Sequence, residues 1–311
     1  LYDANGAVIG ADDPSINHVW RVRKDWQTAD LTVDAANYAG YASTGLVTDA
    51  DIDIVKEQYE HDWTNWPAAW GAPYEDVNGD GTYDPTIDIP GYVGADQTLW
   101  TVANDVPTKF VDVDGDGAVM GEGDKDANGN YTTVINNSAP TLYGSDAIGI
   151  ELQITLWGYA LGAGDPLGNV IFKKAKMVYT GTTTTPAGAM MDDLYFTQWS
   201  DPDLGTYTDD YVGTDVDLSF GFVYNGNRLD GVFNGIYNLP VPSGGYDFFQ
   251  GPRDNKDLDL DGDVDEFLGM TSFTYFGAGS AISDPDLSEY NGSLQFYNLM
   301  EGFLPRPEFP T

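Results

Sequence analysis

The sequence contains no cysteine and only two histidines, His18 and His61, among its 311 residues. A chain without thiols forms no disulfides, no thiolate zinc site, no iron–sulfur cluster and no c-type haem attachment. Two histidines also exclude a histidine-rich metal centre and leave few candidates for a catalytic triad. His61 lies off the apolar stripe of a predicted helix, and we expect it to be an ordinary surface histidine.

Basic residues and long hydrophobic runs are scarce as well. Thirteen Lys and Arg residues stand against 50 Asp and Glu residues, a formal net charge of −37. Such a chain is repelled by nucleic acid and by anionic membranes, so we expect neither as a partner. No apolar run of membrane-spanning length occurs, and we expect no membrane insertion. The sequence starts at Leu1 without a signal peptide, and we expect a processed or partial chain.

The acidic residues are mostly of one kind, with 41 Asp and 9 Glu. Aspartate suits turns and short-armed metal loops, because its carboxylate stays close to the backbone. A surface made acidic only for solubility would be expected to use glutamate freely. The excess therefore indicates metal-binding loops first and solubility second.

Four stretches repeat the alternating oxygen pattern of a calcium loop. Such a loop places oxygen ligands at positions 1, 3 and 5, glycine at position 6, and further acids near positions 9 and 12. In the first stretch Asp76, Asn78 and Asp80 take positions 1, 3 and 5, and Gly81 takes position 6. The closing acid is displaced by one residue, to Asp88. One such loop also arises in plain turns, but four in one chain predict several bound Ca²⁺ ions.

A fifth, more ambiguous candidate lies at residues 199–205, with Asp209 and Asp210 after it, and a calcium site and a turn with solvated side chains explain its acids equally well. The predicted metal ligands of all five stretches are Asp76, Asn78, Asp80, Thr82, Asp84, Asp88, Asp112, Asp114, Asp116, Glu122, Asp124, Asp126, Asn128, Asn130, Asp201, Asp203, Asp257, Asp259, Asp261, Asp263 and Asp265.

The hydrophobic pattern predicts a mainly β fold with an antiparallel β-sandwich or jelly-roll-like core and one or two short N-terminal helices. Thr48 and Asp51 predict a helix start, and an apolar stripe from Ile52 to Trp63 follows. Residues 1–147 are expected to be irregular apart from this helix and the Asp-rich loops. Residues 148–311 are expected to form the β core with an inserted Asp-rich loop, within one compact unit. The strand candidates are 19–22, 148–156, 170–179, 194–199, 216–224, 246–250 and 271–276.

Signals for catalysis are weak. Glu151 could serve as the general acid of a glycosidase, but it alternates with apolar residues and is better explained as an outward-facing strand residue. The sequence has no Gly-x-Ser-x-Gly elbow and no phosphate-binding glycine loop with a lysine. Tryptophans such as Trp70 and Trp199 could stack on sugar rings, although core packing is the commoner role. We expect that the protein is not an enzyme.

Several unusual runs occur in a characteristic order. They are Gly-Ala-Pro-Tyr at 71–74, the Asp-rich loop at 76–85, Gly-Ala-Asp-Gln-Thr-Leu-Trp at 94–100, Gln-Trp-Ser-Asp-Pro-Asp-Leu-Gly at 198–205 and Tyr-Asp-Phe-Phe-Gln-Gly-Pro at 246–252. Across residues 18–255 the chain resembles a group of large uncharacterised secreted proteins of the Bacteroidetes and Ignavibacteria, which often carry C-terminal sorting tails. The resemblance implies an extracellular or cell-surface location and no particular activity.

Three functions remain open at this level. The first is a calcium-binding structural surface protein, the subunit of a self-assembling filament or layer, whose main partner would be another copy of itself. Because subunits of charge −37 repel one another, assembly would need divalent cations or strand exchange. The second is a calcium-stabilised adhesin or carbohydrate-binding module with an extracellular polysaccharide as partner. A polysaccharide-active enzyme is the third and the weakest.

Overall fold

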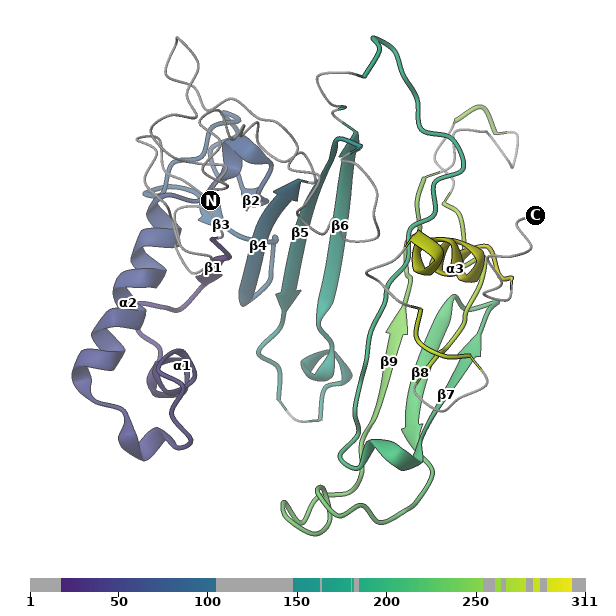
Figure 1. Ribbon diagram of the computed structural model, residues 1–311. Coiled ribbons are helices and arrows are strands. Elements are labelled where there is room, and N and C mark those ends of the chain that lie inside the picture. Colours follow the sequence, from purple (N-terminus) through teal and green to yellow (C-terminus); the bar gives the residue numbers. More distant parts are fainter. Residues whose placement is uncertain are drawn as a thin grey trace, which may run out of the picture. The chain divides into compact units, whose positions relative to one another are not determined.

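The computed structural model describes residues 18–104, 148–162, 164–179, 181, 185–253, 261–263, 267–277, 282–285 and 290–303. Within these ranges the protein is mainly β, with three antiparallel sheets and three α-helices (Figure 1). The predicted β class is therefore confirmed. The described chain divides into two compact units, one ending at residue 189 and the other starting at residue 190.

The first unit is built on a four-stranded sheet in the order β1-β4-β5-β6. Its strands are Trp20–Arg23, Gln97–Asn104, Ile150–Gly158 and Phe172–Tyr179. The sheet thus joins strands from both of the regions expected from the sequence, 1–147 and 148–311. Strand β4 was not predicted, since its region was expected to be a long loop. A small two-stranded sheet pairs β2 (Tyr74–Glu75) with β3 (Ile89–Pro90).

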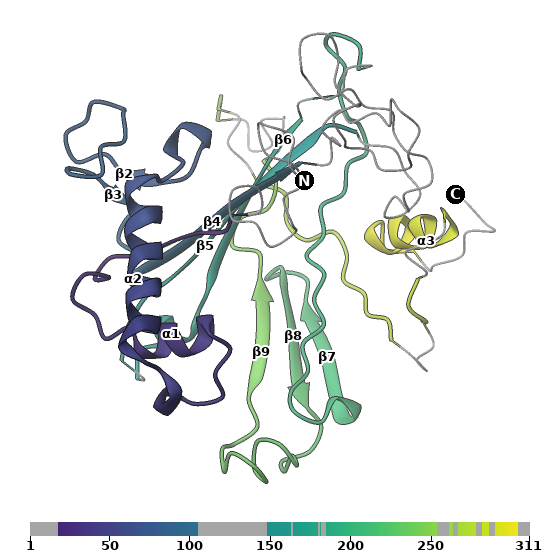
Figure 2. The ribbon, with the colours of Figure 1, turned by 60° about the vertical axis from the view of Figure 1, so that its left-hand side comes forward.

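Two helices, α1 (Thr32–Tyr38) and α2 (Asp49–Thr64), pack together beside β1, as Figure 1 and Figure 2 both show. The predicted start of α2 is confirmed, because Thr48 and Asp51 form a reciprocal capping box. Its predicted apolar stripe is buried as well: Val55 and Tyr59 are 0% and 2% exposed and pack against Trp26 and Leu31. The amphipathic period places this stripe toward α1 and leaves the acidic face in water.

A second core lies on one face of the four-stranded sheet. Trp100 and Val22 meet Trp66 and Ala72 there. The prediction that the apolar residues of β5 form its buried face is wrong. The well-buried side chains of β5 are Gln153 and Thr155, on the face shared with Trp100, while Ile154 and Leu156 are only half-buried. Gln153 is satisfied by bonds to the Trp70 carbonyl and to Glu151.

The second unit carries a three-stranded sheet in the order β7-β8-β9, with strands Asp210–Asp215, Phe220–Asn225 and Ser243–Asp247. Helix α3 (Tyr290–Met300) belongs to the same unit and was not predicted. The strands predicted at 194–199 and 271–276 are wrong, since both segments lack strand structure. Among the described helices, none combines the length and the apolar character that crossing a bilayer requires.

Candidate calcium-binding loops and other candidate sites

The first candidate loop, residues 76–88, connects β2 to β3, whose antiparallel pairing closes its base. The Asp76 carboxylate organises the loop from inside. Its Oδ1 accepts the backbone N–H groups of Gly79 at 2.7 Å and Asp80 at 3.2 Å, and its Oδ2 accepts that of Gly81 at 2.8 Å. Gly81 has φ +76°, so the sharp turn predicted at position 6 is present.

The remaining predicted ligands of the first loop follow the chain around this turn. Asn78 Oδ1 accepts the backbone N–H of Asp80 at 3.0 Å, and Asp80 Oδ1 accepts that of Thr82 at 2.8 Å. The Asn78 amide donates to Asp80 Oδ2 at 3.0 Å. Asp84 accepts both the N–H and the hydroxyl of Thr86. The structure therefore brings Asp76, Asn78 and Asp80 together at the exposed tip.

Asp88 closes the first loop as the displaced acid. It is 2% exposed, its Oδ1 accepts the N–H of Val77 at 3.0 Å, and its Oδ2 accepts that of Asp84 at 2.7 Å. One buried carboxylate thus ties both arms of the loop together. Ile87, which occupies position 12 of the standard spacing, is 46% exposed. The shift by one residue puts the carboxylate on the inside of the loop and the apolar side chain outside.

Aromatic residues anchor the first loop to the end of α2. The Trp63 indole donates to the Pro85 carbonyl at 3.1 Å, and the Tyr83 hydroxyl donates to the Trp63 carbonyl. Burial, reinforced by the charges of Asp88 and Asp84, raises the pKa of the Tyr83 phenol. The loop therefore has a rigid base and an acidic tip.

The chemistry of the first loop fits a hard divalent cation. Burial together with the negative charges of Asp76, Asp88 and Asp80 raises the pKa of Tyr74, so the loop concentrates negative charge. A carboxylate or amide oxygen has two lone-pair sites. Asp76 Oδ2, Asn78 Oδ1 and Asp80 Oδ1 each accept one backbone N–H, which leaves a lone pair on each for a metal contact. Carboxylate and amide oxygens on alternate positions are ligands that Ca²⁺ prefers. These residues would hold the ion and fix the turn around it.

The other predicted loops are described only in small part. The second and third loops, with Asp112, Asp114, Asp116, Glu122, Asp124, Asp126, Asn128 and Asn130, lie outside the described residues, as do Asp257, Asp259 and Asp265 of the fourth. In the fourth loop Gly262 has φ +104°, and Asp261 Oδ1 accepts the N–H of Asp263 at 2.9 Å. An antiparallel bridge between Arg253 and Phe267 flanks this loop, much as β2 and β3 flank the first.

In the fifth candidate stretch, whose acids also include Asp209 and Asp210, the structure shows which carboxylates order the backbone. Asp201 and Asp203 are both exposed, and the carboxylates that order this region come from Asp210 and Asp230. Asp210 Oδ2 accepts the Leu204 N–H at 2.8 Å, and Asp210 Oδ1 is the one buried side-chain oxygen or nitrogen without a hydrogen-bond partner among the described residues. The segment is therefore organised by acids that follow the predicted pair in the chain.

Asp230 holds a turn in the same region. Its carboxylate accepts the N–H groups of Thr206, Val232 and Phe233 at 2.8–2.9 Å, and it is 5% exposed. The Thr206 hydroxyl and these backbone donors favour the charged form and lower the pKa of Asp230 to about 2. No local pattern indicated this role, because Asp230 and Thr206 lie 24 residues apart.

A row of stacked rings, the aromatic strip, lies on one face of the β7–β9 sheet. It consists of Tyr211, Tyr224, Phe222 and Phe220, with neighbouring ring centroids 5.7–6.1 Å apart and interplanar angles of 23–34°. Tyr211 and Tyr224 are directly paired across β7 and β8 and are 57% and 44% exposed. The strip was not predicted as a unit, since β7 itself was not predicted.

Glycines on the strands beside β8 leave room for the phenyl rings of the strip to lie against the sheet. A Cβ atom at Gly213 would come within 2.4 Å of the Phe222 ring, and one at Gly245 within 2.4 Å of the Phe220 ring. The two phenyl rings therefore cover glycine backbone on the flanking strands. Close approach of ring to backbone is the physical reason for glycine at both positions.

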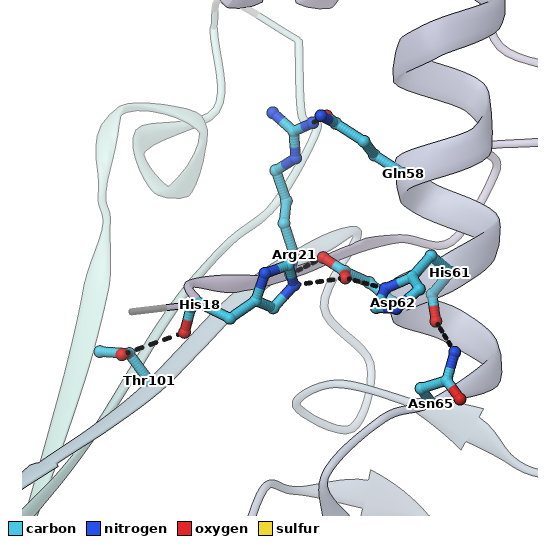
Figure 3. A network of polar contacts seen from close by, with 7 residues as sticks. All are labelled: His18, Arg21, Gln58, His61, Asp62, Asn65 and Thr101. Carbon is cyan, nitrogen blue, oxygen red and sulfur yellow. Dashed lines mark hydrogen bonds and ion pairs between the residues drawn. The ribbon is translucent and has the colours of Figure 1, made fainter. Parts of the chain in front are cut away.

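A second group of metal-ligating side chains joins the start of β1 to the end of α2 (Figure 3). His18 Nε2 lies 2.5 Å from Asp62 Oδ1, and His61 Nδ1 lies 3.1 Å from the same oxygen. This group was not predicted, because His18 and Asp62 are 44 residues apart. The adjacent His61 and Asp62 near the end of a predicted helix were the one local signal.

Comparison with protein families, with curated protein sequences and with solved structures gave no match for this chain.

Proposed function

We propose that this protein is a calcium-binding, mainly β structural protein of the bacterial cell surface, without a catalytic role. The proposal includes an antiparallel sandwich-like core and several Ca²⁺ ions that order the long Asp-rich loops. The single observation that carries it is the first loop, in which Asp76 gathers three backbone N–H groups around an acidic tip. The acidic bias toward aspartate in the whole chain points the same way.

A structural role for the ion follows from where the first loop sits. Its base is a two-stranded sheet, and its Trp63 and Tyr83 anchors belong to the core of the first unit. An ion at the tip would relieve repulsion between neighbouring carboxylates and hold the turn, rather than move one element against another. Calcium would then stabilise the fold in the way that disulfides stabilise other secreted proteins.

Calorimetric titration of the full chain with Ca²⁺ tests this proposal. The variant Asp76→Asn/Asp80→Asn removes two charged ligands of the first loop and should lose one binding event. The matched control Asp53→Asn/Glu57→Gln removes the same charge from two exposed residues of α2 and should leave the titration unchanged. Equal titration curves for both variants and the parent would contradict calcium binding at this loop.

Assembly into a filament or layer is the further part of this proposal. A subunit of charge −37 repels its copies over roughly 8 Å at physiological salt, so divalent cations would have to bridge or neutralise the contacts. Negative-stain electron microscopy with Ca²⁺ and with excess chelator is the test. Ordered polymers that dissolve in chelator are expected, and monomers under both conditions would rule assembly out.

A carbohydrate-binding role is the second candidate, and the aromatic strip favours it. Exposed, nearly parallel rings on one face of a sheet offer apolar faces on which sugar rings stack. Tyr211 and Tyr224 present such faces, and their hydroxyls add hydrogen-bonding capacity. An extracellular polysaccharide would be the partner.

Sedimentation of the protein with insoluble β-linked glucan, in the presence of Ca²⁺, separates this candidate from a purely structural role. Tyr211→Ala/Tyr224→Ala should abolish co-sedimentation. The control Tyr237→Ala/Tyr246→Ala removes two exposed tyrosines outside the strip, Tyr246 being on the opposite face of the sheet by its pairing with Gly221. No binding by the parent protein to any of a panel of glucans and chitin would remove the candidate.

A further inference from the structure

We infer that His18, His61 and Asp62 form a site for one first-row transition-metal ion, with Zn²⁺ as the expected occupant. This site shares no residue with the predicted calcium ligands and differs from the Asp-rich loops in its chemistry. Imidazole nitrogen suits Zn²⁺, Cu²⁺ and Ni²⁺, whereas Ca²⁺ takes oxygen ligands. The two histidines are also the only ones in the sequence, and both converge on a single carboxylate oxygen.

The three side chains already have nearly the spacing that a metal ion requires. One ligand atom from each lies within 4.8 Å of the other two. A tetrahedral ion with bonds of about 2.0–2.1 Å separates its ligands by about 3.3 Å. The observed separations from Asp62 Oδ1 are 2.5 Å to His18 Nε2 and 3.1 Å to His61 Nδ1. Small outward shifts of the rings would admit the ion in place of the shared protons.

The carboxylate of the site is fixed from behind. Asp62 is 4% exposed, and its Oδ2 accepts the backbone N–H of Arg21 at 2.8 Å. This bond turns Oδ1 toward both imidazoles. The Arg21 side chain points away from the cluster, where its guanidinium lies over the Tyr59 ring and donates to Gln58 (Figure 3). The arginine therefore leaves the Oδ1 side of the carboxylate to the two histidines.

The two imidazoles are held by their surroundings as well. The Trp20 ring lies edge-on to His18, with centroids 4.4 Å apart, and stacks on His61 at 5.9 Å and 15°. The Thr101 hydroxyl donates to the His18 carbonyl at 3.4 Å, which ties this residue to β4. These contacts limit the movement of both imidazole rings.

One side of the cluster is open to solvent. The His61 side chain is 58% exposed, while those of His18 and Asp62 are 21% and 5% exposed. An ion can enter past His61, and water would complete the four ligands that Zn²⁺ prefers. Bound there, the ion would connect the start of β1 to the last turn of α2. We assign the site a stabilising role.

Without metal the same atoms form a hydrogen-bonded cluster, and the experiment must separate the two states. The full chain is titrated with Zn²⁺ and, in parallel, with Co²⁺, both in saturating Ca²⁺ so that oxygen-lined loops are filled. Because the chain has two histidines, nitrogen-15 spectra of the imidazoles report each ligand directly. Co²⁺ adds visible absorption that distinguishes four-coordinate binding to nitrogen from the hydrated ion.

We expect one high-affinity equivalent of metal, shifts of both imidazole signals, and four-coordinate Co²⁺ absorption. His61→Gln should weaken metal binding by at least about 100-fold, because it removes a direct ligand. Loss of a residue that only hydrogen-bonds to a ligand already lowers metal affinity by about 10–100-fold. This residue is exposed, so the variant should fold, and His18→Gln provides a second test. The control Asp53→Asn, on the exposed face of α2, should bind as the parent does.

Unshifted imidazole signals at one equivalent of Zn²⁺, or equal affinity in His61→Gln and the parent, would overturn the inference and leave a hydrogen-bonded cluster. The result is independent of the calcium proposal. Asp76→Asn/Asp80→Asn should keep the transition-metal site intact even where it removes a calcium site.

Discussion

Asp88 shows how much one buried carboxylate does at the residue scale. Its two oxygens satisfy the backbone N–H groups of Val77 and Asp84 on opposite arms of the first loop. The spacing predicted that the closing acid is displaced by one position, but it did not predict which way the side chain points. Burial of the side chain at the base of the loop explains the displacement, because position 87 points outward.

Asp88→Ala should destabilise the first unit by about 1–3 kcal/mol, since it leaves two loop N–H groups without their acceptor. Asp88→Asn should cost less, because the amide oxygen still accepts one of the two bonds. Chemical unfolding of the parent and both variants in chelator measures the difference. Equal unfolding midpoints for parent and alanine variant would show that the loop does not depend on this carboxylate.

The low pKa of Asp230 predicts that the turn it holds in the second unit is sensitive to acid. Its pKa is about 2 in the folded protein, against about 3.9 for a free aspartate. Between these values the unfolded chain binds a proton that the folded chain does not. The stabilisation is therefore fully present above about pH 4 and is lost as the pH falls toward 2.

Thermal unfolding of Asp230→Asn across this pH range should give a flatter pH profile than the parent, besides a lower stability at neutral pH. The exposed Asp217→Asn removes an equal charge from the same unit and serves as the control. If the parent and Asp230→Asn profiles ran parallel, the assignment would be wrong.

At the scale of elements, the features encoded by neighbouring residues could be predicted, and the pairing of distant strands could not. Helix α2 was predicted because Thr48, Asp51 and the apolar stripe all lie within one short segment of the sequence. Strand β4 was missed because both of its faces mix polar and apolar residues, so the alternation that marks a half-buried strand is absent. The segments 194–199 and 271–276 have strand-like composition, but strand structure also needs a partner, which composition does not supply.

The same limit applies to the candidate sites. The first loop lies within thirteen residues, so the grouping of its acidic side chains and its left-handed Gly81 could be predicted from spacing alone. The histidine cluster joins His18 to Asp62 across β1 and α2, and the aromatic strip depends on the register of β7 and β8. Both arise from tertiary contacts that no local pattern encodes.

The capping box of α2 offers a prediction at this scale. Thr48 accepts the Asp51 N–H, and the Asp51 carboxylate accepts the N–H and hydroxyl of Thr48. Thr48→Ala should cost about 0.5–2 kcal/mol by exposing helix donors without acceptors. Urea unfolding followed by circular dichroism measures it, with the exposed Thr44→Ala as the control. An effect no larger than that of the control would contradict a role for the box.

At the scale of the whole molecule, the large negative net charge is the main influence on how stability depends on salt. A net charge of −37 on 311 residues opposes the compact state through repulsion between carboxylates. In excess chelator the melting temperature should rise by several degrees as sodium chloride is added, because salt screens this repulsion. Calcium should reduce the salt effect by neutralising the densest loops. A melting temperature independent of salt in chelator would contradict this view.

Thermal unfolding in Ca²⁺ and in excess chelator measures whether calcium bound by the Asp-rich loops stabilises the fold. At a free Ca²⁺ concentration of 100 times the dissociation constant, one site contributes about 2.7 kcal/mol, which corresponds to a rise of about 5–10 °C for a unit of this size. If calcium stabilises the fold through these loops, the melting temperature should rise by at least that amount for the parent and by less for Asp76→Asn/Asp80→Asn. Identical melting temperatures in Ca²⁺ and in chelator would contradict it.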